Sequence, residues 1–197
     1  MNFLAHAHLS GDDDKILTGN LIADAVKGNQ WKNYSSKIQN GILLHRVIDD
    51  FTDKHPLVKQ SRVILRPYFG LYSGVVIDLY FDHFLSVNWS AYSSGQLVDF
   101  TRHIYRVLGK NFFLLPARIK RIIPFMIAQN WLHSYASPVE LEKIFYNMDR
   151  RTGFRSGMKN ALPVLQEHYD QLQKNFNTFY PLLENRVKET GYTLPAD

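Results

Sequence analysis

The sequence has 197 residues, of which 45% are hydrophobic and 21% are charged, and it contains no cysteine. This composition is typical of a folded globular protein and excludes disulfides and thiolate metal sites. The length predicts one domain, residues 1–197, and the lack of cysteine suits a cytoplasmic location. We expect no membrane span, because the longest uncharged run, residues 122–139, contains Pro124 and His133.

Helix start and stop signals recur along the whole chain and predict an all-α fold. Pro56 suits a first helical position, and Ser137-Pro138 followed by Glu140 is a strong helix start. The predicted helices cover about residues 14–28, 35–52, 56–65, 72–89, 96–108, 116–135, 137–150 and 162–188. We therefore expect a single compact domain of seven or eight helices.

Residues 74–85 form the most apolar stretch that also carries charge. Apolar side chains leave no polar face at either helical or strand period, so this segment is expected to be buried all round, yet it contains Asp78, Asp82 and His83. A buried carboxylate is costly unless it is paired or binds a metal. The segment therefore predicts a cation nearby. The alternative is a pair of core aspartates bonded to Arg and Tyr.

Similar polar residues occur earlier in the chain. His45 and Asp49 are spaced i,i+4 on one predicted helix, and Asp24 lies on the helix before it. The full candidate set is His6, His8, Asp24, His45, Asp49, Asp78, Asp82 and His83. Helical bundles build metal sites from such residues on several helices, and nitrogen and oxygen donors without sulfur favour Mn²⁺, Mg²⁺ or Fe²⁺.

The chemistry that such a site predicts is hydrolysis of a phosphoester. A divalent ion lowers the pKa of its bound water and offsets charge on phosphoryl oxygens, which Arg46 and Lys27 could also bind. Each residue also has a plainer interpretation. His45 and Asp49 could be a surface helix pair, Asp24 a helix cap, and His6 and His8 part of a frayed start.

Residues 100–139 contain no acid and are basic. Their positive residues are Arg102, Arg106, Lys110, Arg118, Lys120 and Arg121. Such a surface attracts phosphate or an acidic macromolecule, although a solvated helix face would look the same in the sequence. No nucleic-acid-binding motif is present, so we expect no nucleic acid partner.

Four motifs in the first 90 residues resemble the acyl carrier protein phosphodiesterase family. They are Met1 to Leu9, Gly19 to Asp24, Gly41 to Asp49 followed by Phe51-Thr52-Asp53 and His55-Pro56, and Asp78 to Leu85. Later similarity is limited to Trp131-Leu132, Tyr135, Met148 and Arg150-Arg151. This family is distantly related to the HD phosphohydrolases, so the resemblance implies an HD-like helical fold. The order Asp82-His83 reverses the HD pattern.

The resemblance implies an enzyme that removes phosphopantetheine from holo acyl carrier protein, with Mn²⁺ as the usual metal. It implies Asp24 as an essential acid and His45, Asp78, Asp82 and His83 as site residues. The catalytic residues that we expect are Asp24, His83 and Arg46, with His83 or His45 protonating the leaving serine oxygen. The implied metal ligands are Asp24, His45, Asp78, Asp82 and His83, with His6, His8 and Asp49 as further candidates. Acyl carrier proteins are acidic, so Arg102, Arg106, Arg118, Lys120 and Arg121 are expected to bind the carrier.

Two other functions are compatible with the same residues. A metal-dependent phosphohydrolase could act on a nucleotide or another small phosphoester. A non-catalytic basic helical module could instead bind an acidic partner, with strong salt dependence and no need for metal.

Overall fold

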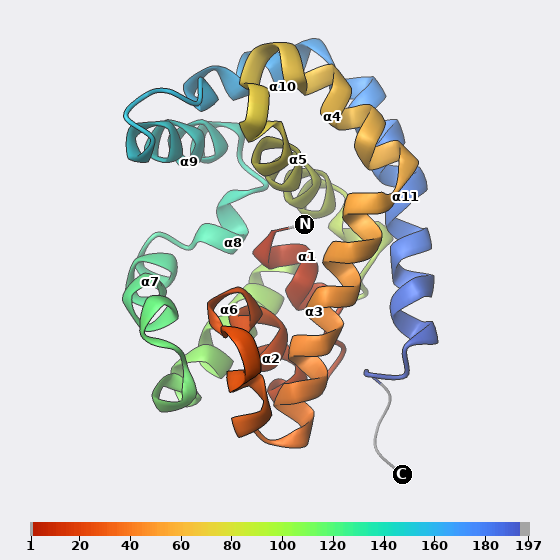
Figure 1. The fold of residues 1–197 in the computed structure, drawn as a ribbon. Helices are drawn as coiled ribbons and strands as arrows, with labels where there is room; N and C mark the ends of the chain where they lie inside the picture. The colour runs from red at the N-terminus through yellow and green to blue at the C-terminus, as the bar shows by residue number, and fades with distance from the viewer. Residues whose placement is uncertain (1, 194–197) are drawn as a thin grey trace.

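The computed structural model describes residues 2–193, and every regular element within them is a helix (Figure 1). The longer helices are α3 (Ser36–Lys54), α4 (Pro56–Phe69), α5 (Ser73–Val87), α6 (Leu97–Lys110), α7 (Ala117–Ala128), α9 (Pro138–Arg151) and α11 (Tyr169–Glu189). The shorter ones are α1 (Phe3–His8), α2 (Asp14–Ile22), α8 (Trp131–Ser134) and α10 (Ala161–Glu167). The all-α prediction is confirmed.

Within the described part of the chain, residues 2–193, six short 3₁₀ helices connect these elements. They are η1 (Ala23–Ala25), η2 (Gly28–Asn33), η3 (Gly70–Tyr72), η4 (Trp89–Ala91), η5 (Phe112–Leu114) and η6 (Met158–Asn160). The first predicted helix was expected to reach Gly28, but α2 ends at Ile22 and η1 follows it. Asp24 therefore lies in a tight 3₁₀ turn. None of the helices within residues 2–193 is both long and apolar enough to cross a bilayer.

The number of helices differs from the seven or eight expected, because residues 2–193 contain eleven α-helices. No helix was expected over α1, Phe3–His8. The predicted helix 116–135 is divided into α7 and α8 at Asn130, whose φ of 46° is left-handed and cannot continue a helix. The predicted helix 162–188 is divided at His168, whose φ of −112° departs from helical geometry.

Helix caps account for several of the predicted starts. The Asp13 carboxylate accepts hydrogen bonds from the backbone N–H groups of Lys15 and Ile16 at the start of α2. Ser137 accepts from the N–H of Glu140 at the start of α9. Each cap satisfies donors that a helix cannot pair internally, which contributes about 1 kcal/mol.

The core lies around α5, which is seen in the upper middle of Figure 1 and packs against α1, α4 and α11. Phe81 and Phe84 of α5 contact Phe176 of α11, with ring centroids 5.4 and 5.8 Å apart. All three aromatic side chains are fully buried. Each such burial contributes about 1.5–3 kcal/mol, so this contact holds the two halves of the chain together.

Helices α2 and α3 approach each other through two glycines. A Cβ atom on Gly19 would lie 2.1 Å from the carbonyl oxygen of Ile38, and one on Gly41 would lie 2.2 Å from the carbonyl oxygen of Ile16. Only glycine fits at either position, because the obstructing atoms are backbone. This close crossing places Asn20 against α3, one turn before His45.

Candidate active site

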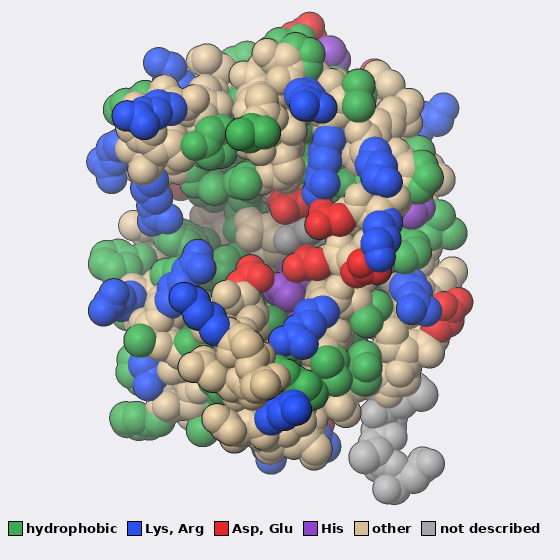
Figure 2. All heavy atoms as spheres, in the orientation of Figure 1, with side chains coloured by type: hydrophobic (Ala, Val, Ile, Leu, Met, Phe, Trp, Pro, Cys, Tyr) green, Lys and Arg blue, Asp and Glu red, His purple; other side chains and the backbone are tan. Residues whose placement is uncertain are grey.

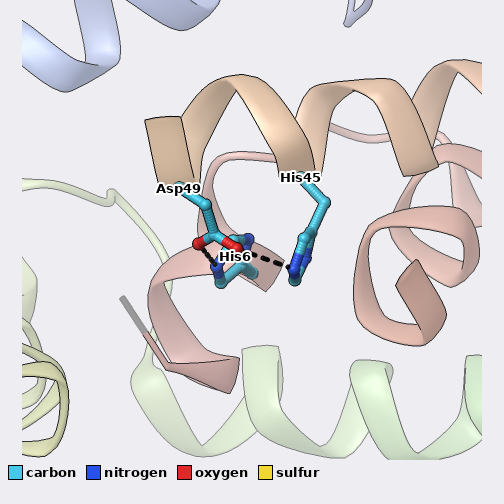
Figure 3. Close-up of side chains that lie close together, drawn as sticks. All are labelled: His6, His45 and Asp49. Carbon is cyan, nitrogen blue, oxygen red and sulfur yellow. Dashed lines mark ion pairs between the residues drawn. The ribbon is translucent and has the colours of Figure 1, made fainter. Parts of the chain in front are cut away.

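Two imidazoles and a carboxylate meet where α1 approaches α3 (Figure 3). His45 and Asp49 share one face of α3, and His6 comes from α1. The Asp49 carboxylate contacts both rings: Oδ1 lies 3.2 Å from His6 Nε2, and Oδ2 lies 3.1 Å from His45 Nε2. His6 and His45 stack with their centroids 4.1 Å apart. Both histidines are buried.

Two residues from the α2 and η1 region complete this cluster. Asp24 Oδ1 lies 3.2 Å from His45 Nε2, so His45 faces carboxylates on two sides. Asn20 Oδ1 lies 2.8 Å from His6 Nδ1 and 3.2 Å from His45 Nδ1. We call His6, Asn20, Asp24, His45 and Asp49 the histidine–carboxylate cluster.

The electrostatics of the cluster favour a charge-separated state in the metal-free protein. Burial lowers the pKa of His45, but hydrogen bonds to Asp24 and Asp49 outweigh it and raise that pKa to about 9. Burial opposes ionisation of Asp49, yet its bonds to both histidines lower its pKa. Burial lowers the pKa of His6. The proton therefore resides on His45, between two carboxylates.

The donor set fits a divalent metal ion. The ligand atoms of His6, His45 and Asp49 all lie within 4.8 Å of one another. Both Nδ1 atoms face Asn20, so in the neutral rings each Nε2 presents a lone pair toward a carboxylate oxygen. Two acceptors face each other stably only when a proton or a cation lies between them. Imidazole nitrogen with carboxylate oxygen suits Mn²⁺ or Fe²⁺.

The cluster lines a cavity of about 620 Å³. One wall, which we call the cluster wall, consists of α1, α2, η1 and α3, and it carries the histidine–carboxylate cluster. The opposite wall, the arginine wall, consists of α7 to α9, and it contributes Arg118, Ile119, Ile122, Phe125, Gln129, Trp131, Tyr135, Ile144, Asn147, Met148, Arg150 and Arg151. Figure 2 shows acidic and histidine side chains in the middle of this face, with Lys and Arg side chains around them.

Three arginines of the arginine wall are exposed, namely Arg118, Arg150 and Arg151. Within residues 2–193, none of them forms an ion pair with an acid. Arg150 and Arg151 lie in the last turn of α9, where a positive charge also interacts favourably with the helix dipole. The wall therefore presents uncommitted guanidinium groups to an anion in the cavity.

The structure does not bring Asp82 into the cluster. The Asp82 carboxylate is fully buried and accepts hydrogen bonds from the backbone N–H groups of Leu4 and Ala5, at 2.9 and 3.2 Å. Burial raises the pKa of Asp82 to about 7, and the two N–H donors oppose that rise. Asp82 thus fixes the start of α1, the helix that carries His6.

The other predicted ligands of α5 also lie outside the cluster. His83 is buried, and its Nδ1 donates to the carbonyl oxygen of Tyr135 at 2.8 Å. Asp78 is partly buried, one turn before Asp82, and is not among the residues that line the cavity. None of these three α5 residues lines the cavity. Asp82 instead supports α1, and His83 supports Tyr135 of the arginine wall.

His8 and Arg46 also lie away from the cavity. His8 bonds through Nδ1 to the Tyr180 hydroxyl and through Nε2 to the Tyr92 carbonyl oxygen. Arg46 stacks on Trp31, with its guanidinium carbon 5.6 Å from the ring centroid, and lines a separate groove on the outer face of α3. The structure thus does not bring Arg46 near the candidate phosphate position. The cause is helical phase, because Arg46 is the neighbour of His45 and turns about 100° away from it.

Among the five arginines and lysines expected to bind a partner, Arg118 alone lines the cavity. Arg102 pairs with Asp99 at 3.5 Å on the outer face of α6. Lys120 donates to the carbonyl oxygen of Phe113. Arg106 and Arg121 are exposed. These four residues are therefore not part of the cavity lining.

Sequence reasoning missed the roles of Asn20, Arg150 and Arg151. A signal was present for Asn20, since it directly follows Gly19 within a motif that also holds Asp24. Arg150-Arg151 is a visible basic pair, but it lies beyond the acid-free stretch on which the partner surface was based. The folded chain brings all three to the same cavity.

The fold and the site define an all-helical protein with a histidine–carboxylate cluster in a cavity faced by arginines. The family described as Acyl carrier protein phosphodiesterase matches residues 1–183. The chain belongs to this family, as the four motifs of its first 90 residues indicated.

Similar curated proteins cover nearly the whole chain. The acyl carrier protein phosphodiesterase of Photorhabdus laumondii subsp. laumondii is 34% identical over 197 residues, which is 99% of this chain and 100% of that protein. Its counterpart in Yersinia enterocolitica is 33% identical over 190 residues, covering 96% of this chain and 98% of that protein. The Klebsiella pneumoniae counterpart is 34% identical over 191 residues, covering 94% and 99%. No solved structure is a significant match.

Proposed function

We propose that this protein hydrolyses the phosphodiester between phosphopantetheine and the serine of holo acyl carrier protein. The products are apo carrier protein and free phosphopantetheine. Family membership supports a phosphodiester hydrolase that acts on a carrier protein. The observation that carries the proposal is that the histidine–carboxylate cluster and three arginines line the same cavity, from opposite walls. The proposed location is the cytoplasm, as expected from the sequence.

The proposed reaction depends on a divalent metal, with Mn²⁺ as our first choice and Mg²⁺ or Fe²⁺ as alternatives. His6, His45 and Asp49 would hold it, with Asp24 beside them. A bound ion of this kind lowers the pKa of a coordinated water and offsets charge on phosphoryl oxygens. The cluster residues must then be deprotonated, so His45 gives up its proton when the metal binds.

Side chains of the two walls bind the phosphate and accept the proton of the attacking water. Arg118, Arg150 and Arg151 bind the non-bridging phosphate oxygens through charge-assisted hydrogen bonds and orient the diester toward the cluster. Asp24 is the most exposed acid of the cluster, with 78% of its side chain accessible. In the metal-free protein the hydrogen bond from His45 lowers the pKa of Asp24. In the metal-bound protein the positive charge of the ion would keep this exposed carboxylate ionised in its place, so that it can accept a proton from the attacking water.

The positive charge of α6 and α7 supports the choice of an acidic protein substrate. Arg106, Lys120 and Arg121 lie on these two helices with Arg118, whereas the charge of Arg102 is partly offset by Asp99. Such a surface steers an acidic carrier toward the cavity and raises the association rate at low salt. The arm of the docked carrier then enters between the two walls.

A reconstitution assay tests the proposal. The purified protein is stripped with a chelator, reloaded with Mn²⁺, and incubated with holo carrier protein, and conversion to the apo form is followed by mass spectrometry. We expect conversion that requires both the metal and the protein-bound arm. Equal turnover after chelation would contradict the metal site. If small phosphodiesters were turned over as fast as holo carrier protein, the substrate would be a small phosphoester and not the carrier protein.

A further inference from the structure

Asn20 lies beneath the histidine–carboxylate cluster and contacts both of its imidazoles. It is fully buried at the end of α2. Its side-chain oxygen faces Nδ1 of His6 at 2.8 Å and Nδ1 of His45 at 3.2 Å. One amide oxygen thus bridges two rings that come from two different helices.

The surrounding hydrogen bonds fix the orientation of this amide. Asn20 Nδ2 donates to the carbonyl oxygen of His6 at 2.9 Å and to Ser10 Oγ at 3.0 Å. The Ser10 hydroxyl donates its hydrogen to the same carbonyl oxygen at 2.8 Å, so it can only accept a hydrogen bond from Asn20. A flipped amide would place its oxygen against the His6 carbonyl and leave two acceptors facing each other. The oxygen of Asn20 therefore points at the imidazoles.

This orientation determines where each ring carries its hydrogen. An amide oxygen has two lone pairs and no proton, so both Nδ1 atoms must donate to it. In the neutral tautomer each ring then has its lone pair on Nε2, and both Nε2 atoms face Asp49. The opposite tautomer of either ring would set a lone pair against Asn20 and turn an N–H toward the cavity.

We propose that Asn20 is a positioning residue that fixes His6 and His45 in the Nδ1–H tautomer and thereby presents both Nε2 atoms as ligands for the metal of the proposed function. Partners on the far side of a ligand ring typically orient that ring and raise its basicity. Here a single amide serves two rings, so its loss affects both ligands at once. The inference rests on the proposed metal site, but the tautomers can be measured without substrate or turnover.

The first test is the tautomeric state of the wild-type histidines. Protein labelled with ¹⁵N in its histidines is saturated with Zn²⁺, a diamagnetic ion that takes imidazole and carboxylate ligands, and is studied by long-range ¹H–¹⁵N spectroscopy without substrate. Both His6 and His45 are expected to show a protonated Nδ1 and an unprotonated Nε2. An Nε2–H tautomer in either ring would overturn the proposal, and no variant is needed for this result.

The second test uses two substitutions of Asn20. Asn20→Leu removes the acceptor, and we expect mixed tautomers and a dissociation constant for Mn²⁺ raised about 10- to 100-fold. Asn20→Asp keeps an acceptor for both rings, and its second oxygen, when protonated, donates to the His6 carbonyl oxygen in place of Nδ2, so we expect this variant to restore the Nδ1–H tautomer. Asn175→Leu is the matched control, because Asn175 is also a buried asparagine but bonds to Ser61 between α11 and α4.

The outcomes separate this inference from the proposed activity. Wild-type tautomers and Mn²⁺ affinity in Asn20→Leu would show that Asn20 only fills space. Altered tautomers and weakened Mn²⁺ binding in Asn20→Leu would support the positioning role. If the wild-type protein also failed to cleave holo carrier protein, the proposed substrate would be wrong while the positioning role would stand. If Asn20→Leu does not fold while Asn175→Leu does, the wild-type spectrum and Asn20→Asp decide the question.

Discussion

The two walls of the cavity hold their charges in different ways. On the cluster wall, each imidazole is buried and bonded on both ring nitrogens, so its geometry is fixed by α1, α2 and α3. On the arginine wall, Arg118, Arg150 and Arg151 are exposed and have no acidic partner within residues 2–193. Fixed groups suit chemistry, which requires near-exact placement, whereas exposed arginines suit recognition of a mobile anion.

The largest expected effect is on the cluster wall. Asp49→Ala removes the carboxylate that contacts both histidines, so the metal loses a ligand, and we expect turnover of holo carrier protein to fall by about 10³-fold or more. The measurement is conversion to apo carrier protein with Mn²⁺ present. Asp50→Ala is the control, since Asp50 is adjacent in sequence but pairs with Lys54. Comparable losses in the two variants would contradict the assignment.

A smaller effect is expected from the glycine crossing that supports the cluster wall. In Gly19→Ala the new methyl group meets the carbonyl oxygen of Ile38, and the helices must separate. We expect the free energy of unfolding to fall by about 1–3 kcal/mol, with loss of activity as Asn20 moves away from His45. Denaturant titration measures this change. Gly109→Ala in α6 has open space and should leave stability unchanged or higher.

The arginine wall should behave differently when it is altered. Replacing Arg150 and Arg151 by alanine removes anion binding without touching the cluster, so we expect KM to rise about 10-fold or more while kcat changes little. Steady-state kinetics at two salt concentrations measures this, because the wild-type advantage should shrink at high salt. Arg155→Ala, in the exposed loop after α9, is the control. A fall in kcat with an unchanged KM would place these arginines in the chemistry instead.

The smallest expected effect is the pH dependence of the metal-free protein. The pKa of His45 is about 9 in the folded protein and 6.5 in an unconstrained chain. Its contribution to stability is therefore fully present below pH 6.5 and is lost as the pH rises to about 9, because the unfolded chain releases this proton first. The denaturant midpoint of the wild-type protein should fall between pH 6.5 and about 9, and the midpoint of His45→Gln should change little over the same range. A rise across the same window would contradict the charge state of the cluster.

Sequence reasoning succeeded where the determinants are local. Capping residues and prolines give the helix starts, and the i,i+4 spacing of His45 and Asp49 places both on one face of α3. Asp24 and His45, which were both expected among the site residues, lie 3.2 Å apart in the structure. These features depend on positions within one helix or its neighbour, which periodicity can show.

The same reasoning could not distinguish Asp49 from Asp82. Both are acids on helices that contribute to the core, and burial of either calls for a compensating partner. The partners of Asp82 are backbone N–H groups that lie 77 and 78 positions earlier in the chain, and a backbone donor leaves no trace in composition or spacing. The likeness to HD phosphohydrolases stays a prediction.

The shortness of α1 has a consequence for how loss of the site can be detected. Isolated helices of six residues are not stable in water, so α1 persists only through its packing and through the hydrogen bonds from Leu4 and Ala5 to Asp82. In a loosely packed state, α3 and α11 can retain helical structure while α1 releases His6. Far-ultraviolet circular dichroism would then report a nearly intact protein after the enzyme had stopped working.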